Sequence, residues 1–374
     1  MTGDQNQKIS LYVHIPFCHN KCFYCSFVIA VGQEQRMDVY LDCLKREAAG
    51  YEGKMLETIY VGGGTPSLLS AAQLERLVKM IRRYFHFSRN CELTIEANPA
   101  TFDREKARII FELGFNRVSL GVQSLNDGYL KFLGRPHDSR QARQAFEILR
   151  QVGFKNINLD LMYSFPGQSE AEIREDAVGI AAWGSEHLSL YTLTVEEGSK
   201  FFKKEYLWQD GLAQEEQYHL VTSILKEAQF EQYEVSNFAR KGFESRHNIC
   251  YWQGENYVGL GVGAHSHFNG ERFWNVTNFM TYLNRLNDGQ SPGAGNEQLS
   301  PPQRLIESLL FGLRMNEGVD IIALEERYEC PLSADRKGLI ERLCEDRLLQ
   351  FYGERLRVTD EGRVVLDEIS ARLI

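Results

Sequence analysis

The chain has 374 residues, of which 43% are hydrophobic and 25% charged, and its net charge is −9 with neutral histidines. This balance is typical of a folded globular protein and excludes a disordered, collagen-like or coiled-coil chain. The length predicts two or three domains. The charge gives no indication of nucleic-acid binding, which requires clustered Lys and Arg residues.

The first half of the chain alternates between predicted strands and predicted helices. Six short runs, several rich in Val, Ile, Leu and Tyr, have the composition of strands buried on both faces. These runs are Leu11–Ile15, Thr58–Val61, Glu92–Glu96, Arg117–Val122, Asn156–Met162 and His187–Leu193. Capping-box patterns begin at Ser70 and Ser169 and precede helical apolar periodicity. Successive strand–helix units predict an α/β fold with a parallel sheet, either open or closed into a complete or partial barrel.

The remaining elements are shorter. A helix over Gln214–Ala228 and a strand over Gln232–Val235 extend the predicted sheet domain, and Leu286–Gln303 has the composition of a linker or long loop. Three further helices are predicted at Gln303–Met315, Ile321–Tyr328 and Ser333–Glu345, followed by a hairpin over Leu348–Val358 and a last helix. This order resembles a winged helix. Residues 301–374 nevertheless hold 11 Lys and Arg against 15 Asp and Glu, which argues against DNA binding.

Three of the eight cysteines, Cys18, Cys22 and Cys25, lie within eight residues of one another, whereas the other five are isolated. The sequence contains neither a visible secretory signal nor an apolar run of membrane-spanning length, so we expect a cytoplasmic protein. In a reducing compartment, clustered cysteines indicate metal ligands or redox groups rather than disulfides.

The spacing of this cluster is C-x3-C-x2-C, directly after the first predicted strand. Structural zinc sites usually take four ligands from paired knuckles, and no second CxxC or His pair follows. Three thiolates suit a [4Fe–4S] cluster with one iron left open to a substrate or cofactor. A zinc knuckle and a coincidental group of thiols are the alternatives.

This motif, at this place in a strand–helix repeat, resembles the radical S-adenosylmethionine (SAM) superfamily. The flanking segment Tyr12-Val-His-Ile-Pro-Phe-Cys18 is similar to oxygen-independent coproporphyrinogen III oxidases and to their relatives, the haem chaperones of the HemW family. The resemblance implies a radical SAM core of partial (β/α)6 barrel type over residues 1–240, a haem-motif region and linker over 241–300, and a HemN-type C-terminal domain over 301–374. It also implies that SAM binds the open iron through its amino and carboxylate groups.

The same resemblance implies a set of residues that contact SAM: Tyr12, Tyr24, Gly63, Gly64, Thr65, Glu96, Gln123, Arg135 and Asp160. Taken alone, the triple glycine that ends the second strand is equally compatible with a plain turn, and charged residues at loop starts are common. Asp160 is more informative, because a carboxylate inside the apolar run Ile157–Met162 is costly unless it is paired or hydrogen-bonded.

A second motif lies at His247-Asn248-Ile-Cys-Tyr251-Trp252 and matches the HNxxYW pattern of HemW-type proteins, which by resemblance lies at the haem site. A neutral imidazole is a common haem ligand, and aromatic side chains can pack on a porphyrin. The alternative is a hydrogen-bonded histidine with Tyr251 and Trp252 in the core. Further candidate ligands are Cys250, His265 and His267. The nearby glycines do not form a dinucleotide fingerprint.

Two departures separate the chain from the oxidases, which carry a fourth cysteine where this chain has Phe27 and a longer extension before the cluster, where this chain has 17 residues. We therefore predict a haem chaperone that carries a [4Fe–4S] cluster with exchangeable SAM, binds haem as cargo and passes it to acceptor proteins. An electron donor and a homodimer are further expected partners, and nucleic acid is not. The alternatives are a radical SAM enzyme acting on a porphyrin, by oxidation or haem breakdown, and a structural metal-binding protein.

Overall fold

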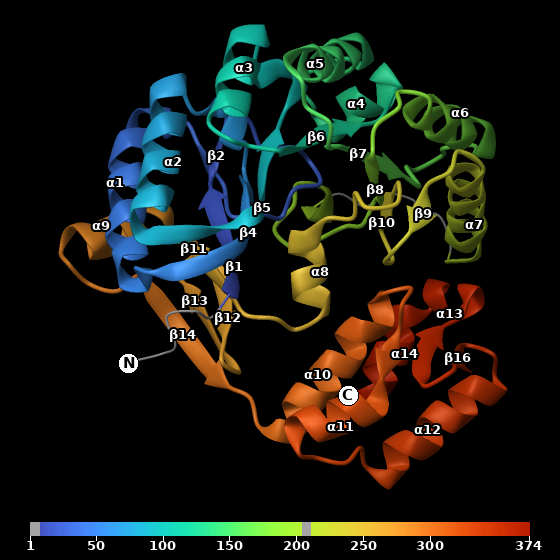
Figure 1. Cartoon of the computed structure of the whole chain (residues 1–374). Coiled ribbons are helices and arrows are strands. Elements are labelled where there is room, and N and C mark those ends of the chain that lie inside the picture. Colours follow the sequence, from blue (N-terminus) through green and yellow to red (C-terminus); the bar gives the residue numbers. More distant parts are fainter. Residues whose placement is uncertain (1–7, 204–210) are drawn as a thin grey trace.

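The computed structural model describes residues 8–203 and 211–374 of the chain. A large sheet with helices on its outer side forms the upper part of Figure 1, and a smaller, mainly helical domain lies below it. Each part has its own hydrophobic core. Within the described residues, no helix is both long enough and apolar enough to cross a membrane.

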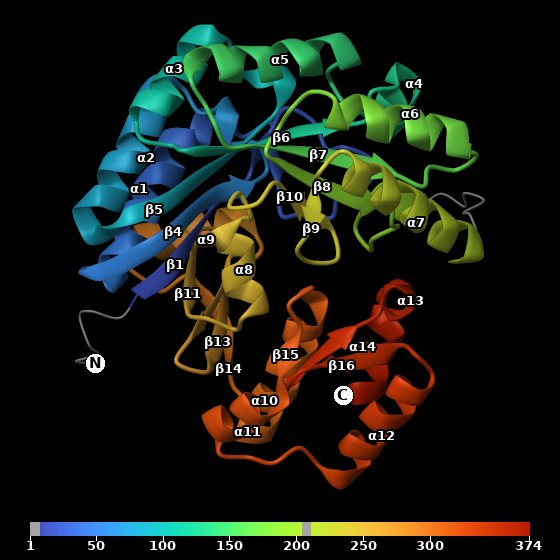
Figure 2. The same ribbon diagram turned by 45° about the vertical axis from the view of Figure 1, so that its right-hand side comes forward.

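Six parallel strands form the centre of the sheet in their order along the chain, which confirms the predicted strand–helix repeat. They are β1 (Lys8–Ile15), β4 (Lys54–Gly63), β5 (Phe85–Ala97), β6 (Arg117–Gln123), β7 (Ile157–Tyr163) and β8 (His187–Thr192). The helices α1 (Met37–Ala48), α2 (Ala71–Tyr84), α3 (Arg104–Glu112), α4 (Asp127–Leu133), α5 (Ser139–Val152), α6 (Glu170–Ala181) and α7 (Gly211–Glu227) accompany them. Strand β1 pairs with β4 and β11 rather than with β8, so the curved sheet stays open as a partial barrel (Figure 2).

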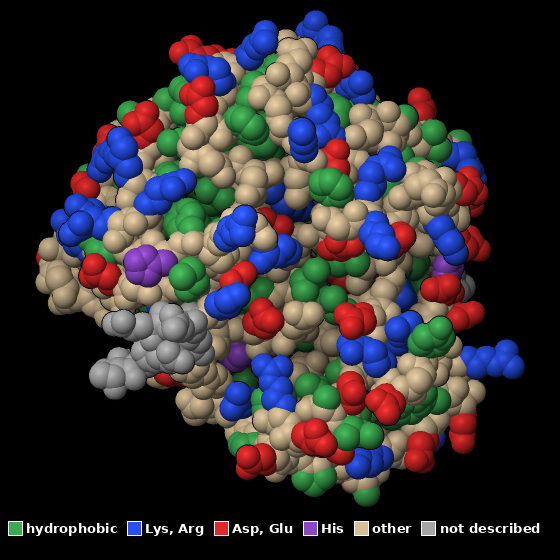
Figure 3. Space-filling model, viewed as in Figure 1, with side chains coloured by type: hydrophobic (Ala, Val, Ile, Leu, Met, Phe, Trp, Pro, Cys, Tyr) green, Lys and Arg blue, Asp and Glu red, His purple; other side chains and the backbone are tan. Residues whose placement is uncertain are grey.

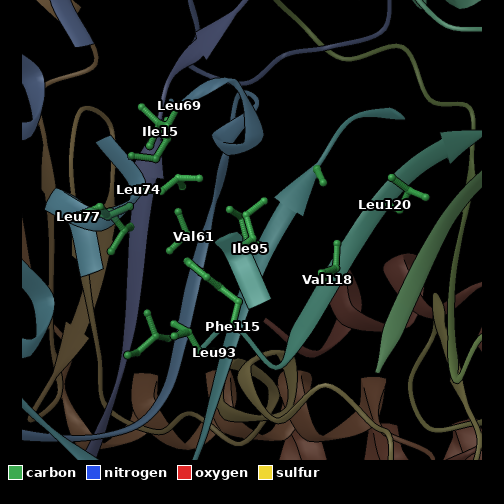
Figure 4. Close-up of a cluster of buried hydrophobic side chains, with 14 of the residues drawn as sticks. Ile15, Val61, Leu69, Leu74, Leu77, Leu93, Ile95, Phe115, Val118 and Leu120 are labelled. Carbon is green, nitrogen blue, oxygen red and sulfur yellow. The ribbon is translucent and has the colours of Figure 1, made fainter. Parts of the chain in front are cut away.

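Local sequence signals explain these elements. The Ser70 hydroxyl accepts a hydrogen bond from the Gln73 amide while the Gln73 side chain accepts one from the Ser70 amide, and a second capping box starts α6 at Ser169. The apolar face of α2 then packs on the sheet, where Leu74 and Leu77 lie against the strands together with Val61 and Ile95 (Figure 4). Burial of such aliphatic side chains is the main stabilising contribution, about 1.5–3 kcal/mol each.

The sheet extends further on the β1 side than the sequence predicts. Strand β11 (Tyr257–Leu260) runs parallel to β1, and β12 (His265–Phe268), β13 (Glu271–Asn275) and β14 (Gly293–Gln298) follow in antiparallel pairs. Strand β14 lies inside the segment predicted to be a linker, so that prediction is wrong there. The side chains of this edge strand are mostly exposed, and it therefore lacks the apolar residues by which a strand is recognised.

The opposite edge and the connecting helices are short. The predicted strand over Gln232–Val235 is replaced by β9 (Glu231–Gln232) and β10 (Asn237–Ala239), which pair with each other next to β8. Helix α8 (Arg246–Trp252) carries the HNxxYW motif, and α9 (Phe279–Asn287) packs beside α1. Two-residue strands β2 (Phe17–Cys18) and β3 (Ala30–Val31) bracket the cysteine loop.

The C-terminal domain has the predicted order of three helices, a hairpin and a terminal helical segment. Its elements are α10 (Pro301–Arg314), β15 (Val319–Asp320), α11 (Ile321–Tyr328), α12 (Ala334–Glu345), β16 (Leu349–Tyr352), β17 (Arg355–Val358), α13 (Asp360–Val364) and α14 (Leu366–Leu373). The hairpin turns at Gly353, which has a φ of +61°. The winged-helix-like arrangement is therefore confirmed.

Candidate functional site

The three clustered cysteines lie in one loop at the carboxyl end of β1. Together they line a cavity of about 460 Å³, called here the cysteine cavity, which opens at the carboxyl ends of the parallel strands. The loop is tied to the barrel: the Phe23 amide donates to the Leu133 carbonyl at 2.9 Å, and the Cys18 Sγ lies 3.4 Å from the Thr65 hydroxyl. The Cys22 sulfur accepts a hydrogen bond from Arg135 at 3.7 Å.

The donor set fits a cluster better than a single ion. Among the residues that the structure describes, no three His, Cys, Asp or Glu side chains are close enough together to hold one metal ion. An iron–sulfur cluster binds each thiolate to a different iron, so its ligands need to surround a cavity rather than meet at a point. Three thiols on the wall of one cavity meet this requirement.

Burial raises the pKa of two of these thiols. Desolvation raises the pKa of Cys18 to about 11, against a smaller lowering by the Thr65 hydroxyl, and it also raises the pKa of Cys25. Since iron binds thiolates, loading a cluster here must release protons.

The cysteine cavity also brings together eight of the nine residues that the sequence assigns to SAM. The eight lining residues are Tyr24, Gly63, Gly64, Thr65, Glu96, Gln123, Arg135 and Asp160. They come from β4, β5, β6 and β7 and from loops far apart in the sequence, and they meet because the carboxyl-terminal parts of parallel strands share one edge of the sheet.

Tyr12 is the exception. It is not among the residues that line the cavity, because its ring lies one layer deeper, stacked on Tyr60 at 6.2 Å between centroids. Its hydroxyl is 2.9 Å from the His14 Nδ1. Tyr12 therefore supports the wall of the cavity from behind.

The glycines at the end of β4 are required by close approach. Gly63 has a φ of +112°, and a Cβ there would lie 2.4 Å from the His14 ring. A Cβ on Gly64 would lie 2.7 Å from the Pro16 carbonyl. The Gly63 amide donates to Glu96 at 2.9 Å. The positive φ and the close approach of His14 are what require glycine at this position.

Glu96 is a half-buried carboxylate in the cavity wall. Besides the Gly63 amide, it accepts a hydrogen bond from the Tyr60 hydroxyl at 2.9 Å. Desolvation raises the pKa of Glu96 to about 7, and the negative charge of Asp160 adds to this rise. Tyr60 was not singled out from the sequence, although it faces the same side of β4 as Gly62, where an alternating pattern could have indicated it.

Asp160 and Arg135 place opposite charges in the same cavity. The Asp160 carboxylate accepts hydrogen bonds from Asn158 at 2.7 Å and from Ser119 at 3.3 Å, which offsets part of the cost of its burial. Burial still raises its pKa. The Arg135 guanidinium donates to the Gly121 carbonyl at 2.8 Å and to Asn98, another cavity residue that the sequence did not indicate.

Gln123 has an unusual backbone. It has a φ of +72° at the end of β6, where the register of the β6–β7 pair shifts between Gly121 and Gln123. A non-glycine residue in the left-handed region carries strain, and such strain is typical of functional sites. The bulge turns the side chain into the cysteine cavity.

The HNxxYW motif forms α8, inside the open side of the barrel. The Glu92 carboxylate accepts hydrogen bonds from the Arg246 and His247 amides, each at 3.2 Å, and thereby caps the helix. Both ring nitrogens of His247 are hydrogen-bonded: Nδ1 is 2.7 Å from the Thr58 hydroxyl and Nε2 is 2.8 Å from the Tyr251 hydroxyl. Burial lowers the pKa of His247 to about 3, so the ring is neutral.

The other motif residues face different neighbours. The Trp252 ring packs edge-on against Phe311 of α10 at 6.1 Å and lies under the Arg314 guanidinium, so it joins the motif to the C-terminal domain. The Asn248 amide donates to the Ser245 hydroxyl at 3.4 Å. Residue Phe27, by contrast, lies at the rim of the cysteine cavity and is 66% exposed.

Comparison with known proteins identifies the family of the chain. A model of the radical SAM superfamily matches residues 12–177, and a model of the HemN C-terminal domain matches residues 299–365. Proteins named "Heme chaperone HemW" from Lactococcus lactis and Bacillus subtilis are 35% and 34% identical to the chain. The match to the Lactococcus lactis protein covers 94% of each chain. The match to the Bacillus subtilis protein covers 96% of this chain and 97% of the relative.

A solved structure shares the fold over nearly the whole chain. It is the coproporphyrinogen III oxidase HemN from Escherichia coli, a radical SAM enzyme, with a TM-score of 0.85 at 23% sequence identity. The match covers 99% of this chain and 91% of that protein. At this identity the likeness establishes the fold and not the reaction.

Proposed function

The chain belongs to the HemW family of radical SAM proteins, and from this premise we propose that it holds a [4Fe–4S] cluster with exchangeable SAM, binds haem and passes it to acceptor proteins. The observation that carries the cluster and SAM part is the cysteine cavity, where three thiols, two half-buried carboxylates and a half-buried guanidinium meet. The haem part is supported by the names of the relatives and by the HNxxYW motif.

The charges in the cavity suit the two ends of SAM. We assign the cluster to Cys18, Cys22 and Cys25. The sulfonium of SAM is positively charged and fits beside Glu96 and Asp160. An amino group that binds iron through its lone pair is neutral, and its N–H groups can donate hydrogen bonds to a carboxylate such as Glu96, while the SAM carboxylate fits a guanidinium such as Arg135. When bound, the reduced cluster supplies the electron that cleaves the sulfonium, and the chain's own residues hold and orient the cofactor.

The cluster can be tested directly. Anaerobic reconstitution, iron and sulfide analysis, and an electron paramagnetic resonance spectrum of the reduced protein with and without SAM should indicate four irons and a signal that SAM alters. Replacement of all three motif cysteines by serine should abolish the signal, whereas Cys91→Ser, outside the cavity, should not. A zinc-only protein would contradict the proposal.

Chaperone and enzyme differ in the fate of the porphyrin. The reconstituted protein should be incubated anaerobically with SAM and reductant, once with haem and once with coproporphyrinogen. A chaperone returns intact haem and transfers it to a haem-free acceptor such as apomyoglobin, whose absorbance reports the transfer. Vinyl formation from coproporphyrinogen, or breakdown of the haem ring, would identify a porphyrin enzyme instead.

The partners are part of the same proposal. An electron donor must reduce the cluster if SAM is cleaved, and a natural acceptor must take the haem. A homodimer is the proposed assembly, which analytical ultracentrifugation with and without haem would test.

A further inference from the structure

A second cavity, of about 670 Å³, lies on the other side of the motif helix. Its lining includes Ser10 and Thr58 from the sheet, Ile249 and Cys250 from α8, His267 from β12 and Arg304 from α10; it is called here the α8 cavity. Ser10 and Thr58 lie before the carboxyl ends of β1 and β4, where the cysteine cavity opens. The α8 cavity and the cysteine cavity therefore lie toward opposite ends of these strands. Figure 3 shows a hollow between the upper part of the molecule and the C-terminal part, with Lys and Arg side chains beside it.

His267 has the orientation of a metal ligand. Its Nδ1 lies 3.2 Å from the Glu255 carbonyl oxygen, which can only accept a hydrogen bond, so Nδ1 carries the proton of the neutral ring. The lone pair is therefore on Nε2, and within the described part of the chain this nitrogen has no hydrogen-bond partner. A ring whose other N–H donates to a backbone carbonyl is the usual arrangement of a histidine that binds a metal.

The other histidines near the motif do not share this arrangement. Both nitrogens of His247 are already hydrogen-bonded and the residue is 1% exposed. His265 stacks on Trp274 at 5.8 Å and does not line the α8 cavity. Cys250 does line it, but burial raises the pKa of its thiol to about 12, which disfavours the thiolate that iron would need.

The charged side chains that line the cavity are of both signs: Lys8, Arg246, Arg304, Arg327, Glu57 and Glu255. Arg304 and Arg327 both line it and both lie over the Tyr328 ring, at 4.9 and 5.4 Å. Neither has an ion-pair partner among the described residues, whereas Arg246 is paired with Glu57 at 3.0 Å. Gly270 lets Arg304 lie against the backbone, since a Cβ there would be 2.9 Å from the Arg304 Cζ. Unpaired guanidiniums suit the two carboxylates of a haem.

We propose that the α8 cavity is the haem site, with His267 Nε2 as a ligand of the iron and with the propionates beside Arg304 and Arg327. This inference rests on the proposed function, because it names the place of the haem that the protein binds. The volume is within the range of cofactor sites. The HNxxYW motif then forms the wall of the site, with Ile249 and Cys250 against the porphyrin and His247 behind them.

The iron ligand can be tested with ferric haem. The wild-type protein, titrated with haemin, should give the absorption and electron paramagnetic resonance signature of histidine ligation. In His267→Ala this signature should disappear and the affinity should fall at least about tenfold, and added imidazole should restore the spectrum. His265→Ala, two residues earlier on the same strand, is the matched control and should behave as wild type.

The proposed contacts of Arg304 and Arg327 with the haem propionates need a separate experiment. Arg304→Ala and Arg327→Ala should each weaken haemin binding about 10- to 100-fold, the usual loss for a charged hydrogen bond. The same variants should bind haem dimethyl ester, which lacks the two charges, as well as the wild type does. Arg342→Ala, at an exposed position of α12, is the control.

The outcomes separate the site from the function. If His267→Ala keeps the histidine signature, or if His247→Gln removes it while His267→Ala does not, the haem site proposed here is wrong although the protein still binds haem. If the wild-type protein does not bind haemin, the proposed function itself fails. Circular dichroism of each variant confirms that it is folded, and imidazole rescue of His267→Ala cannot arise from an unfolded chain.

Discussion

The clearest test of the cysteine cavity is the pH dependence of SAM binding. Glu96 has a pKa raised by burial to about 7, and its ionised form is the one that attracts the positively charged sulfonium of SAM and best accepts hydrogen bonds from its amino group. The affinity for SAM should therefore rise as the pH passes upward through 7. With a pKa of about 7, roughly one tenth of Glu96 is ionised at pH 6 and nine tenths at pH 8, so the dissociation constant should fall about tenfold between them.

Glu96→Gln keeps the shape of the side chain and removes the charge. The variant should bind SAM about 10- to 100-fold more weakly than the wild type at pH 8, because a hydrogen bond to a charged group is worth about 1.5–3 kcal/mol. At pH 6, where most of the wild-type carboxylate is already protonated, the difference should shrink by about tenfold.

The assay is equilibrium binding of SAM to the anaerobically reconstituted protein at pH 6, 7 and 8. The amino group of SAM also titrates near this range, but it does so equally for every variant, so the comparison between variants isolates Glu96. Glu105→Gln, an exposed position of α3, is the control. An unchanged pH profile in Glu96→Gln would refute the assignment of this carboxylate to SAM.

Three further predictions concern the support of the two cavities. Glu47 is buried among hydrogen-bond donors, and burial raises its pKa to about 7 from 4.5. Its contribution to folding is therefore complete below pH 4.5 and is lost as the pH rises through 7. Glu47→Gln should remove about 2.5 kcal/mol of the difference in unfolding free energy between pH 5 and pH 8, measured by denaturant unfolding. Tyr60→Phe removes a hydrogen-bond donor to the Glu96 carboxylate and should weaken SAM binding about 2- to 10-fold at pH 8 in the same binding assay. An unchanged affinity would show that this hydrogen bond does not contribute to SAM binding. Gly63→Ala should lower the thermal stability by more than Gly167→Ala, because both glycines have a positive φ but only a Cβ at Gly63 meets a neighbouring ring.

The central sheet could be predicted from the sequence because its signals are local. Strands buried on both faces are apolar runs, and the capping boxes at Ser70 and Ser169 mark the starts of helices within four residues. The edge strand β14 has no such signal. It is held by hydrogen bonds to β13, and its composition is that of a loop because its side chains face solvent.

The cysteine cavity was predictable for a different reason. Parallel strands bring their carboxyl ends to one edge, so residues that follow successive strands meet there whatever their separation along the chain. This rule does not predict how deeply a given side chain lies within the barrel. Tyr12 and Tyr60 are opposite each other in the β1–β4 register, yet only Tyr60 reaches the cavity, because its hydroxyl extends to Glu96 while that of Tyr12 turns to His14.

The HNxxYW motif shows why a string of residues does not define a site. The partners of His247 are Thr58, 189 positions earlier in the chain, and Tyr251, one turn later on the helix, and neither contact can be read from the motif. The ring of His247 also stacks on Tyr60 at 5.2 Å.

Two neighbouring inward positions of β4 thus serve different cavities. Thr58 lines the α8 cavity, Tyr60 lines the cysteine cavity, and His247 contacts both. A ligand that moved Tyr60 would change its stacking contact with the ring of His247, which belongs to the helix that lines the other cavity. Since such coupling is reciprocal, a factor by which SAM changed the affinity for haem would equal the factor by which haem changed the affinity for SAM. If SAM and haem bind where we propose, the motif helix is the partition between the two ligands, a role that does not require it to supply the iron ligand.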